Sequence, residues 1–218
     1  MDVSELEKLY KYLADDDIGG KYRLSTENFV FFLNEAQRKA ARNANLIFDK
    51  TSAITTKSII SGKSIYPIDT SIYAIVAARL DQNGTITYLT PTDRIEVDRV
   101  YPDWREQATT PNFYIHGRNT IELIPVPDTT FTLNLEVYRY PEKLECLSDE
   151  LEIEEEHHEH LVDWVLYRAF STKDADSVDV AKAMDAKNNF LSYFGQEPRA
   201  EIRKSQYQNK PHHNKAAI

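Results

Sequence analysis

The sequence predicts an α+β protein: an α-helical bundle body with an inserted small antiparallel β module, a sandwich or partly open barrel, and an extended C-terminal tail. Apolar residues recur at helical spacing before residue 50 and after residue 145. Between these positions they recur at every second residue, which is typical of strands. We therefore divide the chain into N-terminal helices at 1–50, a β-rich module at 51–145, a helical hairpin at 146–195 and a flexible basic tail at 196–218.

Two helices are expected in the N-terminal segment. The first runs from about Ser4 to Ala14, because Ser4 and Glu7 have the spacing of a capping box. The second begins at Ser25, whose hydroxyl can accept a hydrogen bond from the first turn. Its apolar stripe is rich in alanine, which favours close approach of a helix from the same chain or from another subunit. The stripe consists of Phe29, Leu33, Ala36, Ala40 and Ala44.

The middle segment is expected to form about five to seven short strands. The dipeptide Asn83-Gly84 is typical of a two-residue hairpin turn, and the alternation over 121–137 predicts a second hairpin. A short helix over 92–100, capped by Thr92 or Asp93, is expected between the hairpins. The first hairpin has an inward face predicted to consist of Ile72, Ala74, Val76, Ala78 and Leu80.

Helices return after the β module. Glutamates at 154–156 suit the positive end of a helix that continues to Phe170. After a break at 171–174, Asp176 is expected to cap the last helix, and Gly195 to end it. The two helices are joined by a short loop and therefore form a helical hairpin.

Composition and charge exclude several classes of protein. The net charge of −9 over 218 residues argues against a protein that grips DNA along its phosphates, although an acidic surface would let DNA slide past. No apolar run approaches the roughly 20 residues that cross a bilayer, and the acidic start is the reverse of a signal peptide. The single cysteine, Cys146, excludes an internal disulfide. We expect synthesis in the cytoplasm and no membrane partner.

Motifs for catalysis or for cofactor binding are missing. The six glycines do not have the spacing of a dinucleotide-binding or phosphate-binding loop, and no nucleophile elbow occurs. We expect no enzymatic activity, no catalytic residue and no cofactor. His157 and His160 could share a metal ion with a carboxylate, but the order of a zinc protease motif is missing. The alternative is a solvated first helical turn, and we expect no metal there.

Two further features leave alternatives open. Aromatic residues of the β module could stack on sugars, which would make the protein a carbohydrate-binding or hydrolytic component, or they could fill the core. These are Tyr66, Tyr73, Tyr88, Trp104, Tyr114 and Tyr138. The basic tail from residue 196 lacks periodicity and is expected to be disordered alone. It either has no role or becomes ordered on an acidic partner.

Short motifs in a fixed order carry a resemblance. They are Tyr66-Pro67 with Asp69, Asn83-Gly84, Pro102 with Trp104, Pro111 with Tyr114, the run Ile121, Leu123, Pro125 and Pro127, and Tyr138 with Pro141 before an acidic helix. Over roughly residues 24–194 the chain resembles head-to-tail adaptor proteins of tailed bacteriophages, most closely the SU10 type. The N-terminal helix and the loop at Asp15–Asp17 match least, so their role stays open.

The resemblance implies a structural virion protein at the head-to-tail junction, assembled in the host cytoplasm. Such adaptors dock as a dodecameric ring under the portal protein and link the DNA-filled capsid to tail or nozzle proteins, while DNA passes through the lumen without specific binding. A head-completion or tail-terminator protein is the alternative within the virion. The implied contacts between subunits are Ala36, Ala40, Ala44, Val162, Leu166 and Phe170, and Ala40→Glu is expected to abolish ring incorporation. The implied portal-binding residues of the tail are Arg199, Ile202, Arg203, Lys204, Tyr207, Lys210 and Ile218.

Overall fold

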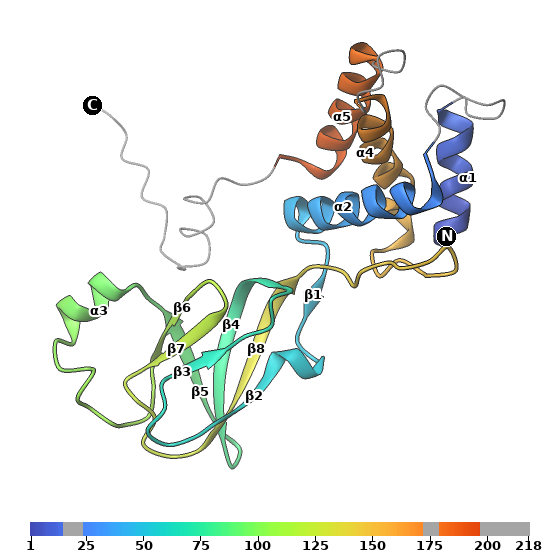
Figure 1. Cartoon of the computed structure of the whole chain (residues 1–218). Helices are drawn as coiled ribbons and strands as arrows, with labels where there is room; N and C mark the ends of the chain where they lie inside the picture. The colour runs from blue at the N-terminus through green and yellow to red at the C-terminus, as the bar shows by residue number, and fades with distance from the viewer. Residues whose placement is uncertain (15–23, 172–178, 197–218) are drawn as a thin grey trace, which may run out of the picture. The chain divides into compact units, whose positions relative to one another are not determined.

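The computed structural model describes residues 1–14, 24–171 and 179–196 (Figure 1). Within these ranges, residues 1–47 and 140–196 form one compact unit, the helical unit, and residues 48–139 form another, the sheet unit. No helix of the described residues is long and apolar enough to cross a membrane. The predicted extended tail at 196–218 lies, beyond Gln196, outside the described residues.

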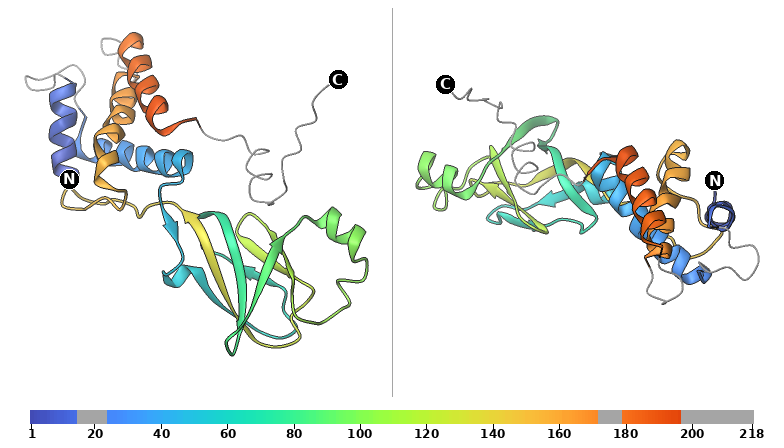
Figure 2. Two further views of the ribbon diagram at one scale, coloured as in Figure 1. Left: turned by 180° about the vertical axis from the view of Figure 1, so that it is seen from behind. Right: turned by 90° about the horizontal axis from the view of Figure 1, so that it is seen from above.

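The helical unit is built from four α-helices and a short 3₁₀ turn. They are α1 (Val3–Leu13), α2 (Thr26–Ala44), the 3₁₀ turn η2 (Glu155–His157), α4 (His158–Phe170) and α5 (Val180–Phe194). Figures 1 and 2 show α2 running across α1 and α4, with α4 and α5 side by side. The predicted helical bundle body is therefore wrong.

The burial pattern of α4 explains this arrangement. A bundle needs a single apolar stripe along each helix, but α4 is buried on several faces because α1, α2 and α5 all pack against it. Its buried side chains include the consecutive residues Trp164, Val165 and Leu166, which do not lie on one face. The core also contains Phe29 and Leu33 from α2. The short helices thus pack around a central α4 instead of running parallel.

The ends of the helices show which capping residues the chain uses. The predicted cap of α2 is confirmed, because the Ser25 hydroxyl accepts a hydrogen bond from the Asn28 amide at 3.2 Å. The predicted capping box of α1 is displaced by two residues: the Glu5 amide donates to Asp2 at 2.8 Å, and the Asp2 amide donates to Glu5 at 3.1 Å. The cap of α5 in the structure is Asp179, and Asp176 lies outside the described residues.

The sheet unit contains one eight-stranded sheet, curved into a half-barrel. Its strands are β1 (Phe48–Asp49), β2 (Thr56–Ile59), β3 (Ile65–Pro67), β4 (Ile72–Gln82), β5 (Thr85–Pro91), β6 (Phe113–His116), β7 (Thr120–Ile124) and β8 (Phe131–Arg139). Two helical segments accompany them, η1 (Ala53–Thr55) and α3 (Arg94–Val100). The strand order is β1-β8-β4-β5-β6-β7-β3, and β2 shares the β8 edge with β1.

The sheet is mixed, so the predicted antiparallel module is wrong. Strands β5 and β6 run parallel, with Thr90 beside Phe113 and Pro91 beside Tyr114. Parallel neighbours need a crossover connection. The segment containing α3 supplies it, and Asp93 caps this helix by accepting a hydrogen bond from the Glu96 amide at 2.8 Å. The short helix and one of its two expected caps are confirmed, but its role as a crossover was not predicted.

A bulge in β4 changes which side chains enter the core. The pairing of β4 with β8 shifts between Ile75 and Ala77, so the alternation slips by one residue. As a result Ile75 is buried, whereas Val76 is 47% exposed. The predicted inward face is therefore wrong at Val76 and correct at the other four positions. The half-barrel encloses an apolar core that includes Leu80, Ile121, Leu123 and Leu133.

Candidate functional site

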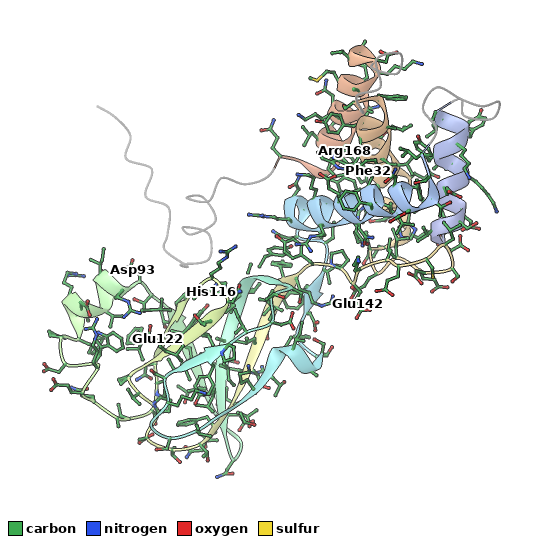
Figure 3. All side chains as sticks on the ribbon, in the orientation of Figure 1. Phe32, Asp93, His116, Glu122, Glu142 and Arg168 are labelled. Carbon is green, nitrogen blue, oxygen red and sulfur yellow. The ribbon has the colours of Figure 1, made fainter. Side chains whose placement is uncertain are left out.

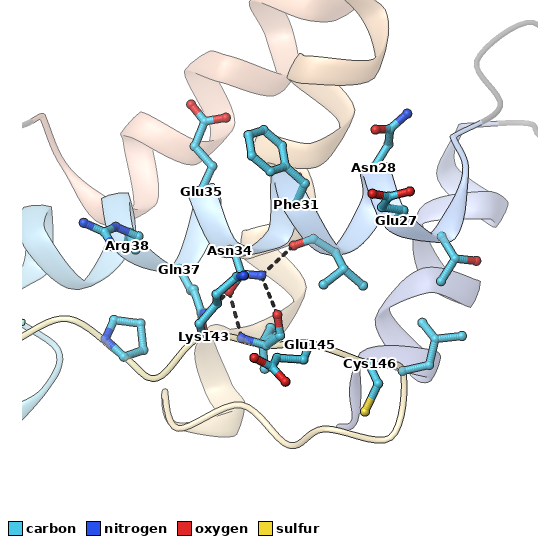
Figure 4. Close-up of a pocket in the computed structure, with 15 residues that line it drawn as sticks. Glu27, Asn28, Phe31, Asn34, Glu35, Gln37, Arg38, Lys143, Glu145 and Cys146 are labelled. Carbon is cyan, nitrogen blue, oxygen red and sulfur yellow. Dashed lines mark hydrogen bonds between the residues drawn. The ribbon is translucent and has the colours of Figure 1, made fainter.

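A groove with a cavity volume of about 1080 Å³ lies on the helical unit, between α2 and the loop 141–147 (Figure 4). Both sides belong to the same compact unit. Its lining residues on α2 are Thr26, Glu27, Asn28, Val30, Phe31, Asn34, Glu35, Gln37 and Arg38. From the loop they are Pro141, Lys143, Leu144, Glu145, Cys146 and Leu147. A groove of this size on a compact unit is a candidate docking surface.

Amide side chains of α2 fix the loop that forms one wall of the groove. Asn34 Nδ2 donates to the Leu144 carbonyl at 2.9 Å, and the Leu144 amide donates back to Asn34 Oδ1 at 2.9 Å. Gln37 Nε2 donates to the Glu142 carbonyl at 3.0 Å and to Asn34 Oδ1 at 2.8 Å. Figure 4 shows Asn34 and Gln37 directed toward the loop. The groove is therefore preformed, because side chains of α2 hydrogen-bond the backbone of the loop and hold it in place.

Phe31 is the most exposed apolar side chain of the groove. It is 63% exposed and points away from the loop (Figure 4). Its ring meets the Phe32 ring edge to face, with 5.6 Å between centroids. Phe32 in turn lies 5.0 Å from the Arg168 guanidinium, which pairs with Glu35 at 3.3 Å (Figure 3). The exposed ring of Phe31 beside this packed neighbour makes the outer side of α2 a candidate interaction surface.

The residues predicted to join subunits lie mostly inside the chain's own core. Ala36, Ala40, Val162, Leu166 and Phe170 are all buried in the core of the helical unit, and Ala44 is exposed. Their role between subunits stays a prediction. An Ala40→Glu substitution would place a carboxylate in this core, so loss of assembly in that variant would not identify an interface.

Phe31 was not among the predicted contacts, although the sequence carries a signal for it. The run Phe29-Val30-Phe31-Phe32-Leu33 is apolar around the whole circumference of a helix. A helix at the surface can bury only part of that circumference, so at least one of these side chains has to face solvent. The tertiary structure exposes Phe31 and buries Phe29 and Leu33.

The tail residues predicted to bind the portal protein lie outside the described residues. They are Arg199, Ile202, Arg203, Lys204, Tyr207, Lys210 and Ile218. Their part in binding stays a prediction.

The histidines near the start of α4 occupy three different environments. His158 is buried, with Nε2 at 2.7 Å from the Ile153 carbonyl. His160 stacks on Tyr193 at 3.6 Å between ring centroids, while His157 Nδ1 lies 3.1 Å from the Tyr193 hydroxyl. His157 instead lies with Glu154 and Glu156, and His160 is not part of this group of possible metal ligands.

The aromatic residues of the β module are mostly part of its interior. Tyr66, Trp104 and Tyr114 are buried, and burial raises the pKa of Tyr114 to about 12. Tyr66 donates to the Ile60 carbonyl at 3.1 Å, and Trp104 Nε1 donates to Asp98 at 2.8 Å. Tyr73 and Tyr138 are half-buried, which leaves Tyr88 as the exposed member of this predicted set. A stacking platform for sugars needs several exposed rings, so this arrangement does not favour it.

A family model described as SU10 adaptor protein matches residues 1–212. The chain belongs to the SU10 adaptor protein family. The match confirms the resemblance and extends it to the N-terminal helix. No curated protein matches the chain. The SU10 adaptor family is a structural one, so the protein is a structural adaptor of a phage and a component of the virion.

Proposed function

We propose that this adaptor docks as a ring, a dodecamer, beneath the portal protein and links the DNA-filled capsid to the tail. The family match over residues 1–212 carries this proposal. The preformed groove with exposed Phe31 supports it, because a ring subunit has to present apolar surface to its neighbours. The net charge of −9 suits a protein through whose lumen DNA passes without specific binding.

The ring requires two different surfaces on each subunit. Closed rings of identical chains are built from head-to-tail contacts, in which one patch meets a different patch on the next copy. The α2 groove is our candidate for one of these patches. The loop that forms one of its walls is held by Asn34, so the surface needs little reordering on association. Phe31 then serves as the aromatic anchor that is buried by the neighbour.

Phe31→Asp is expected to give a folded subunit whose incorporation into the ring falls by about tenfold or more, since losing an aromatic anchor typically costs at least about 2 kcal/mol of binding. Purified adaptor is mixed with its portal protein and the occupancy of rings is counted by electron microscopy. Ile95→Asp is the matched control, because Ile95 is 84% exposed on α3 of the sheet unit. Wild-type occupancy of Phe31→Asp rings would exclude the groove as the subunit contact.

Removing residues 198–218 is expected to leave a folded subunit that no longer binds the portal protein. The deleted segment carries Arg199, Arg203, Lys204, Lys210 and Lys215 against one acidic side chain, Glu201. We propose that it orders on an acidic portal surface. Co-sedimentation with the portal protein measures binding, and the full-length chain should bind less at higher salt. Equal binding by the truncated and full-length chains would contradict this role.

A head-completion or tail-terminator protein would have a different place in the particle. Imaging the complete virion distinguishes these possibilities, since an adaptor is expected between the portal protein and the tail. Density for this chain at the far end of the tail would exclude the adaptor ring.

A further inference from the structure

Two glutamates and a histidine converge at the turn that precedes α4. The carboxylates of Glu154 and Glu156 and a ring nitrogen of His157 all lie within 4.8 Å of one another. The 3₁₀ turn over Glu155–His157 brings this about, because residues three apart are eclipsed in such a turn. Glu155 takes no part, since its carboxylate accepts a hydrogen bond from the Met1 amino group at 3.0 Å.

Tyr193 of α5 determines which nitrogen of His157 faces the carboxylates. The Tyr193 hydroxyl donates to the Glu156 carbonyl at 3.4 Å, so its oxygen is left to accept from His157 Nδ1–H at 3.1 Å. Nε2 is then the ring nitrogen that faces Glu156, whose Oε1 lies 3.6 Å away. Tyr193 is itself held by stacking on His160 at 3.6 Å.

Glu154, Glu156 and His157 are therefore placed to bind one metal ion together, and Tyr193 holds the His157 ring in orientation. Histidine ligands of metal ions usually donate their other ring N–H to a fixed acceptor, which sets the tautomer. A cation placed between the His157 ring nitrogen and the carboxylates of Glu154 and Glu156 would offset the repulsion between the two carboxylates. The start of a helix also repels an isolated cation, and two carboxylates offset that repulsion.

We propose that Glu154, Glu156 and His157 bind a divalent transition-metal ion of the Zn²⁺ class. An imidazole with two carboxylates suits Zn²⁺, whereas Mg²⁺ and Ca²⁺ prefer oxygen ligands alone. The bound ion would fasten the start of α4 to the last turn of α5 through the contact between His157 and Tyr193. The site is therefore a structural clamp on the two helices, independent of how the subunits assemble.

The test measures Zn²⁺ binding by titration calorimetry on the full-length chain with His212→Gln and His213→Gln, because the adjacent tail histidines could bind the ion separately. We expect one saturable Zn²⁺ per chain and a higher melting temperature in its presence. In that background, His157→Gln and Glu154→Gln should each weaken binding at least tenfold and remove the thermal shift. Tyr193→Phe should weaken binding by about tenfold, as loss of an orienting partner does.

One histidine variant serves as the matched control in the same background. His116→Gln alters an exposed histidine of the sheet unit and should bind Zn²⁺ like the parent chain. Absence of Zn²⁺ binding, or binding that is unchanged in both His157→Gln and Glu154→Gln, would overturn the proposal.

Discussion

Phe190→Ala is expected to lower the free energy of unfolding of the helical unit by about 3 to 5 kcal/mol. The Phe190 ring is fully buried and lies 5.1 Å from the Trp164 ring and 4.8 Å from the Phe194 ring, measured between centroids. Removing the ring takes away buried apolar surface and leaves a cavity between α4 and α5. Neighbouring aromatic rings are large and rigid, so they fill such a cavity poorly.

Urea titration followed by ¹⁹F NMR of fluorotryptophan-labelled protein measures this loss for the helical unit alone. The chain has two tryptophans, of which Trp164 reports on the helical unit and Trp104 on the sheet unit. Met184→Ala is the matched control on the same helix, because Met184 is 47% exposed, and it should change stability by about 0.5 kcal/mol or less. Equal losses in the two variants would show that Phe190 does not anchor this core.

Asp49→Asn is expected to lower the free energy of unfolding of the sheet unit by about 3 kcal/mol, as removal of one partner from a buried ion pair does. The Asp49 carboxylate is buried and accepts from Arg139 Nε at 2.7 Å, which ties β1 to the end of β8. It also accepts from the Ser52 hydroxyl at 2.6 Å and from the Thr51 and Ser52 amides at 3.1 Å. The neutral amide keeps the size of the side chain but loses its charge.

The same carboxylate makes the stability of the sheet unit depend on pH. Burial acts to raise the pKa of Asp49, but the hydrogen bonds from Ser52, Arg139 and Thr51 outweigh it and hold the pKa well below its ordinary value. A depressed folded-state pKa gives stability that is fully present above the unfolded pKa of about 3.9. That stability is lost as the pH falls below about 4 toward the folded-state pKa. Asp49→Asn should lack this part of the acid sensitivity.

Asp69→Asn provides the control for Asp49. Asp69 is exposed, and its carboxylate accepts a hydrogen bond from the Ser71 amide at 2.8 Å. Its replacement should therefore lower the free energy of unfolding by about 1 kcal/mol or less. The Trp104 signal in urea titrations at several pH values measures both variants. An Asp49→Asn chain as stable as the parent at neutral pH would show that the ion pair does not stabilise the sheet.

Local features of the fold could be predicted where they depend on neighbouring residues. Ser25 and Asp93 cap their helices as expected, because a capping side chain bonds an amide three residues away. Asp2 displaced Ser4 as the cap of α1, since both positions offer a side-chain oxygen and only the position of the helix start selects between them. The Asn83-Gly84 turn between β4 and β5 also formed as predicted.

The candidate site could be predicted only in part. The apolar run 29–33 indicates that α2 has too many apolar faces to bury, but it does not indicate which face stays exposed. The loop 141–147 lies more than 100 residues away along the chain, and its hydrogen bonds with Asn34 and Gln37 depend on the fold. The histidines at 157, 158 and 160 are visible in the sequence as possible ligands. The contact of His157 with Tyr193 could not be predicted, because it depends on how α5 packs on α4.

The sequence by itself determined the family, the order of the helical and strand-rich segments, the Asn83-Gly84 turn and the caps at Ser25 and Asp93, because these depend on residue types at short spacings. Only the tertiary structure decided that the helices cross rather than form a bundle, that β5 and β6 pair in parallel, and that Phe31 faces solvent while Ala40 is buried. The physical reason is that periodicity shows which residues are apolar, but not what covers them. Burial of α4 on several faces and the crossover through α3 arise from contacts between segments far apart in the chain.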